Sequence, residues 1–160
     1  MTDHLGSARA TIRFLVGDDE PLGRQRVLEL LAPHDVEVVG TAADGVEAVS
    51  AIRTLRPDIV FLDVQMPRMS GLDVIREVGS MSMPVTVFVT AFDQYAITAF
   101  DMSAIDYLVK PFKDERFVEA LARAREKAQT KNVVRLHEQL LSLLQGGQAP
   151  VPAPPPAALP

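Results

Sequence analysis

Apolar runs alternate with amphipathic stretches along most of the chain. Five runs are apolar at nearly every position and predict strands over 11–17, 36–42, 58–64, 84–92 and 105–110. The stretches between them carry apolar residues near helical spacing and predict helices over 22–34, 44–57, 71–81 and 93–103. A fifth helical pattern runs from Lys113 toward Leu144. The chain is therefore expected to alternate strictly between strand and helix.

This alternation determines the predicted fold class. Strands that are apolar throughout, joined by helices, indicate a parallel sheet that is covered on both faces. Right-handed crossovers then give a doubly wound α/β sandwich of the (βα)5 type. Five strands suit the flavodoxin-like order 2-1-3-4-5, with the last helix extended, although the sequence alone leaves a Rossmann order open.

The two ends of the chain differ in composition from its middle. We expect residues 1–10 to form a flexible N-terminus and 11–128 to form the folded domain. A helical extension is expected over 129–146, followed by a disordered Pro/Ala-rich linker over 147–160. The linker would lead to a further domain, so we interpret the chain as part of a longer protein or as one that has lost its effector.

The last helical pattern has two parts. Its first part carries an apolar stripe that we expect to pack on the sheet, made of Phe117, Val118, Leu121, Ala124 and Ala128. Beyond the polar patch at 130–132, heptad spacing relates Val133, Leu136, Leu140 and Leu143. This second part suits a dimer seam or a helix folded back on its own domain. The shift of spacing at the patch predicts a kink or a break there.

Composition and charge exclude several classes of protein. The chain has 160 residues, of which 48% are hydrophobic, and no cysteine, so disulfides and cysteine-based zinc sites are excluded. Its formal net charge of -5 disfavours direct binding to nucleic acid. No apolar run approaches the ~20 residues of a membrane span, and the N-terminus lacks the apolar core of a signal peptide. We expect no membrane partner and a cytoplasmic location.

Polar residues gather where the predicted strands end. Ligands of open α/β sheets bind beyond the carboxyl ends of the strands. At these ends lie Asp18, Asp19 and Glu20 after the first strand, Asp63 after the third, Thr90 at the fourth and Lys110 at the fifth. Crowded carboxylates repel one another, and a divalent cation removes that conflict. Oxygen ligands without nearby histidine or cysteine favour Mg²⁺, with Mn²⁺ as an alternative.

This set of residues predicts phosphoryl chemistry. Asp63 would be the nucleophile, since a carboxylate attacks phosphorus to give an aspartyl phosphate. Lys110 would neutralise charge on the transferred group and Thr90 would hydrogen-bond one of its oxygens. Each residue also has an ordinary structural role: Asp63 as a turn former, Asp18 and Asp19 as caps of the following helix. The coincidence of all four strand ends favours the functional interpretation.

Four segments together resemble the receiver domain of bacterial two-component response regulators. They are "VGDDEPLGR", "DIVFLDVQMPRMSGLDVI", "VFVTAF" and "AIDYLVKPF", and the resemblance covers roughly residues 12–125. It implies that Asp63 accepts the phosphoryl group and that Asp18, Asp19, Asp63 and the backbone carbonyl of Gln65 hold Mg²⁺. It also implies that Tyr107 is a switch aromatic, turning inward when Thr90 is drawn to the phosphoryl group, and that the Lys110–Pro111 bond is cis. Gly17 departs from the residues usual before the acid pair.

The resemblance also implies partners. The segment "TAFDQYAITAFDMSAIDYLVKPF" is similar to receivers joined to LytTR-type (LytR/AlgR-like) DNA-binding domains. We expect a histidine kinase to dock near the first helix and the loop after the fifth strand. A homodimer is expected through the face formed by 95–102, 106–109 and the final helix, through the C-terminal helix, or through both. DNA would be contacted only by an output domain that is absent here.

Two other functions compete with a phosphorylation switch. An aspartate-nucleophile phosphatase or dehalogenase-like hydrolase uses a second acid two residues after the nucleophile, and that position is Gln65, which disfavours an enzyme. A phosphorylation-independent dimerisation module needs none of the strand-end residues, so their joint presence argues against it. The favoured function is a phosphoacceptor that controls a transcriptional output.

Overall fold

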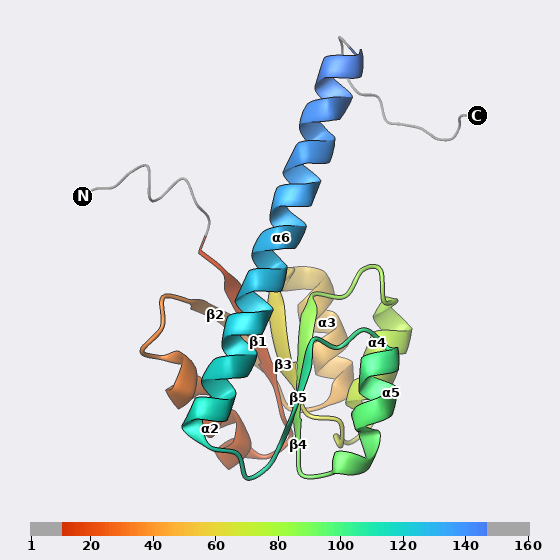
Figure 1. Cartoon of the computed structure of the whole chain (residues 1–160). Helices are drawn as coiled ribbons and strands as arrows, with labels where there is room; N and C mark the ends of the chain where they lie inside the picture. The colour runs from red at the N-terminus through yellow and green to blue at the C-terminus, as the bar shows by residue number, and fades with distance from the viewer. Residues whose placement is uncertain (1–10, 147–160) are drawn as a thin grey trace. The chain divides into compact units, whose positions relative to one another are not determined.

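The computed structural model describes residues 11–146, apart from the side chains of Ile97 and Phe100 (Figure 1). The predicted flexible N-terminus and the predicted linker over 147–160 lie outside the described residues. Within the described range the chain divides into two compact units, with the boundary between Ala128 and Gln129. No helix among residues 11–146 combines the length and the apolar character needed to cross a membrane.

Five parallel strands form one sheet in the order β2-β1-β3-β4-β5, which confirms the predicted flavodoxin-like fold and excludes a Rossmann order. The continuous apolar runs give β1, β3 and β4, whose residues are buried almost throughout. The observed bounds are β1 Arg13–Gly17, β2 Glu37–Ala42, β3 Ile59–Leu62, β4 Val85–Thr90 and β5 Asp106–Val109.

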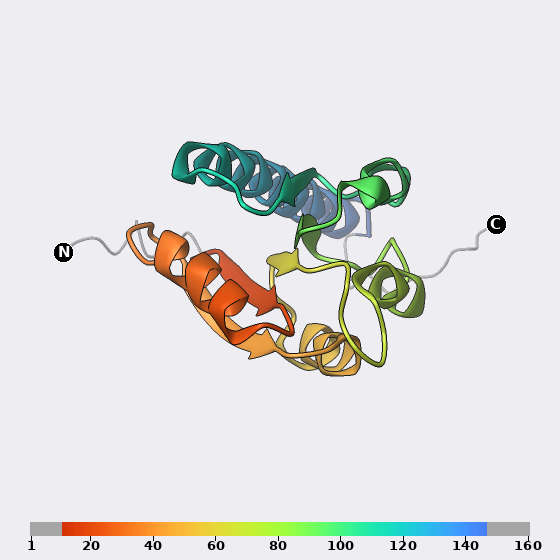
Figure 2. The same cartoon turned by 90° about the horizontal axis from the view of Figure 1, so that it is seen from below.

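Helices cover both faces of this sheet. Figure 2 shows α2 and α6 on one side and α3, α4 and α5 on the other. The helix bounds are α2 Pro21–Leu31, α3 Gly45–Leu55, α4 Gly71–Val78, α5 Ala96–Asp101, preceded by the 3-10 turn η1 Asp93–Tyr95, and α6 Asp114–Gly146. The alternation predicted from the apolar pattern is therefore present. Most elements are shorter than predicted, whereas α2 begins one residue earlier and α6 continues beyond Leu144 to Gly146.

Neighbouring residues of each central strand face different cores. Phe61 of β3 stacks between Phe14 of β1 and Phe117 of α6, with ring centroids 6.0 and 5.1 Å apart. Leu62, the next residue along, belongs to the opposite core with Leu72 of α4 and residues of α3. This two-sided burial explains why the strands are apolar at successive positions rather than at alternate ones.

Two details of the helices differ from the sequence prediction. The predicted break at 130–132 is wrong, because α6 is helical without interruption from Asp114 to Gly146. Thr, Lys and Asn cost a helix well under 1 kcal/mol each, whereas a break usually needs Pro or Gly. Val118 does not belong to the packed stripe and is 45% exposed. Leu22 of α2 is 84% exposed, because it lies nine residues before the buried Leu31, and a turn of 100° per residue puts the two side chains on opposite faces of the helix.

Candidate functional site

The strand register brings the polar strand ends to one edge of the sheet. Gly17 pairs with Leu62, so Asp18 and Asp63 leave β1 and β3 at the same level. The Asp63 backbone N–H donates to the Gly17 carbonyl at 2.8 Å. At the far side of the sheet, the Lys110 N–H donates to the Thr90 carbonyl at 2.8 Å. Residues from four separate segments therefore meet at the carboxyl edge seen in Figure 2.

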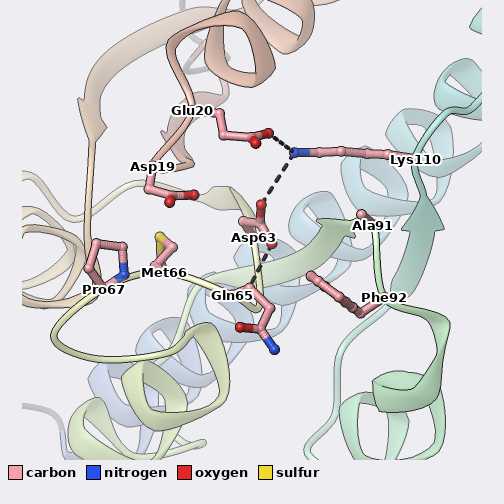
Figure 3. Close-up of a pocket in the computed structure, with 9 residues that line it drawn as sticks. All are labelled: Asp19, Glu20, Asp63, Gln65, Met66, Pro67, Ala91, Phe92 and Lys110. Atoms are coloured by element: carbon pink, nitrogen blue, oxygen red, sulfur yellow. Dashed lines mark hydrogen bonds and ion pairs between the residues drawn. The ribbon is translucent and has the colours of Figure 1, made fainter.

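The carboxylates of Asp18, Asp19 and Asp63 and the ammonium of Lys110 form the centre of the site. Figure 3 shows all of these residues except Asp18. Oxygens of Asp18, Asp19 and Asp63 lie within 4.8 Å of one another, a set that could hold a metal ion. Asp18 and Asp63 are buried and Asp19 is exposed. Lys110 Nζ lies 2.7 Å from Asp18 Oδ2 and 3.2 Å from Asp63 Oδ2. The arrangement places the Lys110 ammonium in direct contact with the two buried carboxylates.

Burial and neighbouring charges both shift the pKa values of Asp63 and Lys110. Removal from water raises the pKa of Asp63, against the opposing effects of the Gln65 N–H and the Lys110 charge. Burial alone would lower the pKa of Lys110, but its hydrogen bond to Asp18 and the charge of Asp63 outweigh burial and raise it. Lys110 therefore stays an ammonium ion, as an electrostatic role for this residue requires.

The ordinary structural roles considered for the acids are present only in part. Asp63 does act as a turn former, because its Oδ1 accepts the Gln65 N–H at 3.0 Å. Neither Asp18 nor Asp19 caps α2: the N-cap residue is Glu20, which makes no side-chain cap bond. Asp18 instead accepts the Glu20 N–H at 2.9 Å while its other oxygen contacts Lys110. Asp19 does not cap the helix, and its carboxylate lies in the cluster with Asp18 and Asp63.

The loop between β3 and α4 is held tightly beside Asp63. The Gly71 N–H donates to the Val64 carbonyl at 2.8 Å, and a Cβ at Gly71 would lie 2.4 Å from the Asp63 carbonyl oxygen. Only glycine allows this approach. A capping box between Ser70 and Asp73 then starts α4. The loop that carries Gln65 is thus fixed at both of its ends.

Gly17 and Gly23 are both closely packed against the site. A Cβ at Gly17 would lie 2.8 Å from Leu62 Cδ1, so the Leu62 side chain fills the space left by the missing side chain. A Cβ at Gly23 would lie 2.4 Å from Asp18 Oδ2 and 3.1 Å from Lys110 Nζ. The first turn of α2 therefore approaches the buried ion pair as closely as a helix backbone can.

Thr90 is the last residue of β4, and Tyr107 lies in the neighbouring strand β5. The Thr90 hydroxyl is buried and has no hydrogen-bond partner among the described residues, although its proximity acts to lower the pKa of Asp63 against the effect of burial. Tyr107 is buried, and burial raises its pKa. Its hydroxyl donates to the Phe92 carbonyl. Tyr107 is thus turned inward. The Lys110–Pro111 bond is cis, as predicted.

A pocket of about 500 Å³ opens beside Asp63. Figure 3 shows Asp63 and Lys110 on one side of it and Phe92 on another, with the Gln65 side chain turned away from the carboxylates. The complete lining is Asp19, Glu20, Asp63, Gln65, Met66, Pro67, Ala91, Phe92 and Lys110.

Two polar contacts, one at the amino end of β5 and one beside the site, were not predicted from the sequence. Asp106 of β5 is buried and pairs with Arg116 of α6 at 2.6 Å and with Arg123 at 3.5 Å. Burial would raise the pKa of Asp106, but the hydrogen bonds from Arg116 outweigh it and lower the pKa. The available signal was an acid inside an apolar strand followed by two arginines seven residues apart on a helix. Tyr95, which contacts Gln65, gave no comparable signal.

Comparison with known proteins assigns the chain to a family. A model of the response regulator receiver domain matches residues 14–122. The chain belongs to this family. The transcriptional regulatory proteins BtsR of Salmonella typhi and Escherichia coli K12 are 44% and 43% identical to it over 133 residues, 82% of this chain. The chain spans only 56% of the length of these relatives.

Solved receiver domains have the same architecture. The response regulatory domain of mrkE from Klebsiella pneumoniae is 27% identical, with a TM-score of 0.69 over 74% of this chain and 99% of that one. The REC domain of AraT, a response regulator from Geobacillus stearothermophilus, is 30% identical, with a TM-score of 0.69 over 76% of this chain and 98% of that one. The receiver family consists of signalling domains of two-component systems, which interact with histidine kinases and generally bind Mg²⁺ at an acidic pocket. An acidic cluster of Asp18, Asp19 and Asp63 is present at the corresponding edge of this chain.

Proposed function

We propose that this receiver accepts a phosphoryl group on Asp63 from a histidine kinase, with Mg²⁺ at the acidic cluster. The observation that carries the proposal is the convergence of Asp18, Asp19 and Asp63 within 4.8 Å, next to a lysine ammonium 3.2 Å from Asp63. An Asp63 oxygen attacks phosphorus, a P–O bond forms and the P–N bond to the kinase imidazole breaks. The imidazole leaves with the electron pair and takes up a proton.

The oxygen-only donor set fits Mg²⁺ or Mn²⁺. Asp18, Asp19, Asp63 and the Gln65 backbone carbonyl would hold the ion, which would neutralise charge on the transferred group. Lys110 lies on the other side of Asp63 and balances the remaining charge. Its ammonium would exchange Asp63 for a phosphoryl oxygen, because the contact with Asp18 keeps it in place at 2.7 Å.

Acetyl phosphate with Mg²⁺ tests this proposal. The chain should gain the mass of one phosphoryl group, the gain should need the divalent cation, and Asp63→Asn should abolish it. Asp58→Asn is a matched control, because Asp58 precedes the same strand at its opposite end and its carboxylate accepts the Arg13 N–H at 2.8 Å. Equal phosphorylation of the Asp63→Asn variant would show that another residue is the acceptor.

We further propose that phosphorylation acts through Thr90 and Tyr107. The unpartnered Thr90 hydroxyl is a donor available to a phosphoryl oxygen. Thr90→Ala should leave phosphorylation by acetyl phosphate possible but weaken the conformational response. Thr86→Ala is the control, since Thr86 is equally buried in β4 but its hydroxyl is satisfied by the Pro84 carbonyl at 3.0 Å.

A histidine kinase is proposed to dock on α2 and the loop after β5, which implies a cytoplasmic location. Leu22 supports this surface, because a large apolar side chain 84% exposed beside the acidic site is available to a partner. Leu22→Asp should slow phosphotransfer from the cognate kinase while acetyl phosphate still phosphorylates Asp63. Equal slowing with both donors would place the defect in the site instead of the surface.

We propose that the domain over 11–128 and the helical extension over 129–146 are separate units, the extension leading to a LytTR-type DNA-binding domain. DNA would be bound only through that domain. The relatives named transcriptional regulators support the proposal, as does the fact that the chain spans 56% of their length. The codons that follow Pro160 in the gene test it directly: an output domain of another type would overturn it.

Homodimerisation is proposed through the face of α5, β5 and α6, through the extension, or through both. Each surface exposes apolar side chains: Val109 and Val118 on the first, and Val133, Leu136, Leu140 and Leu143 on the second, all 40% exposed or more. Sedimentation velocity with and without acetyl phosphate separates them. Val118→Glu should disrupt only the first contact and the double variant Leu136→Glu/Leu140→Glu only the second. A monomer in every condition would refute both.

A further inference from the structure

The two tyrosines of the chain fasten the segment after β4 to two different parts of the site. Tyr107 of β5 donates its hydroxyl to the Phe92 carbonyl. The Phe92 ring meets the Tyr95 ring edge to face, with centroids 6.5 Å apart. The Tyr95 hydroxyl accepts a hydrogen bond from Gln65 Nε2 at 2.8 Å. An unbroken series of contacts thus runs from the loop after Asp63, through η1, to the tyrosine of β5.

Gln65 joins this series to Asp63. Its backbone N–H donates to Asp63 Oδ1 at 3.0 Å, and its side-chain amide reaches 30 residues along the sequence to Tyr95. Figure 3 shows that side chain directed away from Asp63 and Lys110. The side chain of Gln65 is therefore free of the carboxylate site and is used to hold the neighbouring segment.

We propose that Gln65 and Tyr95 form a latch, and that Tyr95 is a positioning residue which helps to keep Tyr107 turned inward. The hydrogen bond from Gln65 fixes the Tyr95 ring, and that ring supports Phe92. Phe92 in turn presents the carbonyl that accepts the Tyr107 hydroxyl. Loss of the latch frees the Tyr95 ring, loosens Phe92 and weakens the inward arrangement of Tyr107.

This inference rests on the proposed function at Asp63, because phosphorylation of Asp63 is the event that would move the segment held by the latch. Thr90 lies two residues before Phe92, so a shift of its unpartnered hydroxyl toward Asp63 moves the segment that both tyrosines hold. A ligand that favours one arrangement is itself bound more tightly when that arrangement is stabilised. The latch and the phosphoryl group then stabilise the same inward position of Tyr107.

The size of the effect follows from the contact. One hydrogen bond between partly solvated side chains contributes a net stabilisation that changes an equilibrium constant about two- to five-fold. Both Gln65→Ala and Tyr95→Phe remove this bond, and Tyr95→Phe keeps the ring that contacts Phe92. Because the two substitutions remove the same bond, their effects should not add. Gln94→Ala is a matched control that truncates the exposed glutamine next to Tyr95.

The test is tyrosine ¹³Cζ NMR on the whole chain, which has two tyrosines and no tryptophan. Tyr95→Phe and Tyr107→Phe assign the two resonances, and urea unfolding shows that each variant is folded. Spectra are recorded without additions and with acetyl phosphate and Mg²⁺, alongside mass spectrometry. The inward population of Tyr107, relative to the outward one, should fall about two- to five-fold in Gln65→Ala and in Tyr95→Phe. The double variant should fall no further, and Gln94→Ala should match the wild type.

Additive effects of the two substitutions, or a Tyr107 population unchanged by either, would overturn the latch. These outcomes are separate from failure of the proposed function, which would be a wild-type chain without phosphoryl gain. In that case the spectra of the unphosphorylated variants still decide the matter. Equal and non-additive changes of the Tyr107 population in Gln65→Ala and Tyr95→Phe would support the latch, and the absence of such changes would overturn it.

Discussion

Replacing Lys110 by methionine removes the cation that contacts the carboxylates of both Asp18 and Asp63, while keeping much of the side-chain volume. Lys110 Nζ lies 2.7 Å from Asp18 Oδ2 and 3.2 Å from Asp63 Oδ2. At an effective dielectric constant of ~20, these contacts amount to about 6 and 5 kcal/mol of gross attraction. Carboxylate oxygens up to 4.8 Å apart repel by about 3.5 kcal/mol or more on the same scale.

The net loss is smaller than the gross attraction, because removal of the lysine also removes its desolvation cost. Loss of one partner from a buried ion pair costs roughly 3–5 kcal/mol, and Lys110, at 20% exposure, belongs at the lower end. We expect Lys110→Met to lose about 3 kcal/mol of the free energy of unfolding in the presence of chelator. Added Mg²⁺ should restore part of this loss, since a divalent cation offsets the same repulsion.

Urea unfolding measures this difference. With an m-value of about 2 kcal/mol/M, the midpoint should fall by about 1.5 M. Arg76→Met is the control: its contact with Asp73 is as short, at 2.9 Å, but the two side chains are 59% and 51% exposed. An exposed pair contributes about 0–1 kcal/mol. Equal losses in the two variants would refute the claim that burial makes the Lys110 contacts strong.

Three further predictions concern other contacts. Asp106→Asn should lower the free energy of unfolding at pH 7 by about 2–4 kcal/mol, since it leaves the Arg116 contact unbalanced. The pKa of Asp106 is lowered by folding. Its contribution to the free energy of unfolding is therefore present above the ordinary carboxyl pKa and is lost as the pH falls through the folded-state value. A difference in urea midpoint between wild type and Asp106→Asn that stays constant from pH 7 to pH 2 would contradict this. Gly23→Ala should lower the free energy of unfolding by about 1–3 kcal/mol, because the added Cβ would lie 2.4 Å from Asp18 Oδ2. It should also weaken Mg²⁺ binding measured by calorimetry, and an unchanged affinity would show that α2 moves freely. Phe61→Ala should lower the free energy of unfolding by about 3–5 kcal/mol, because Phe61 is 1% exposed. It should leave phosphorylation by acetyl phosphate unchanged, because Phe61 packs in the core on the face of the sheet away from Tyr107. Altered phosphorylation would link that core to the site.

The sequence predicted the strands and their polar ends because both are local features. A continuous apolar run identifies a doubly covered strand, and the next residue must then lie at the sheet edge, as Asp18 and Asp63 do. The resemblance to receivers added the cis bond at Lys110–Pro111, which the structure confirms. Roles assigned to Gln65 and Tyr107 by resemblance remain predictions.

Features that depend on which residues meet in space could not be predicted from the sequence. The bond between Gln65 and Tyr95 depends on how two loops approach, and no spacing rule connects them. The exposure of Val118 follows from a turn of 100° per residue, which places it beside the stripe headed by Phe117 and not within it. The expected break at 130–132 failed because polar composition lowers helix preference without interrupting the backbone hydrogen bonds.

Successive residues of β3 face two different cores, so substitutions at neighbouring positions should have different effects. Phe61 faces the aromatic stack with α2 and α6, whereas Val60 and Leu62 face the core that contains Tyr107. A saturation screen that reads abundance and signalling separately should therefore show a two-residue rhythm along β3. Substitutions at Phe61 would reduce abundance alone, and substitutions at Val60 or Leu62 would also bias the signal. One strand would then carry two nearly independent phenotypes, interleaved residue by residue.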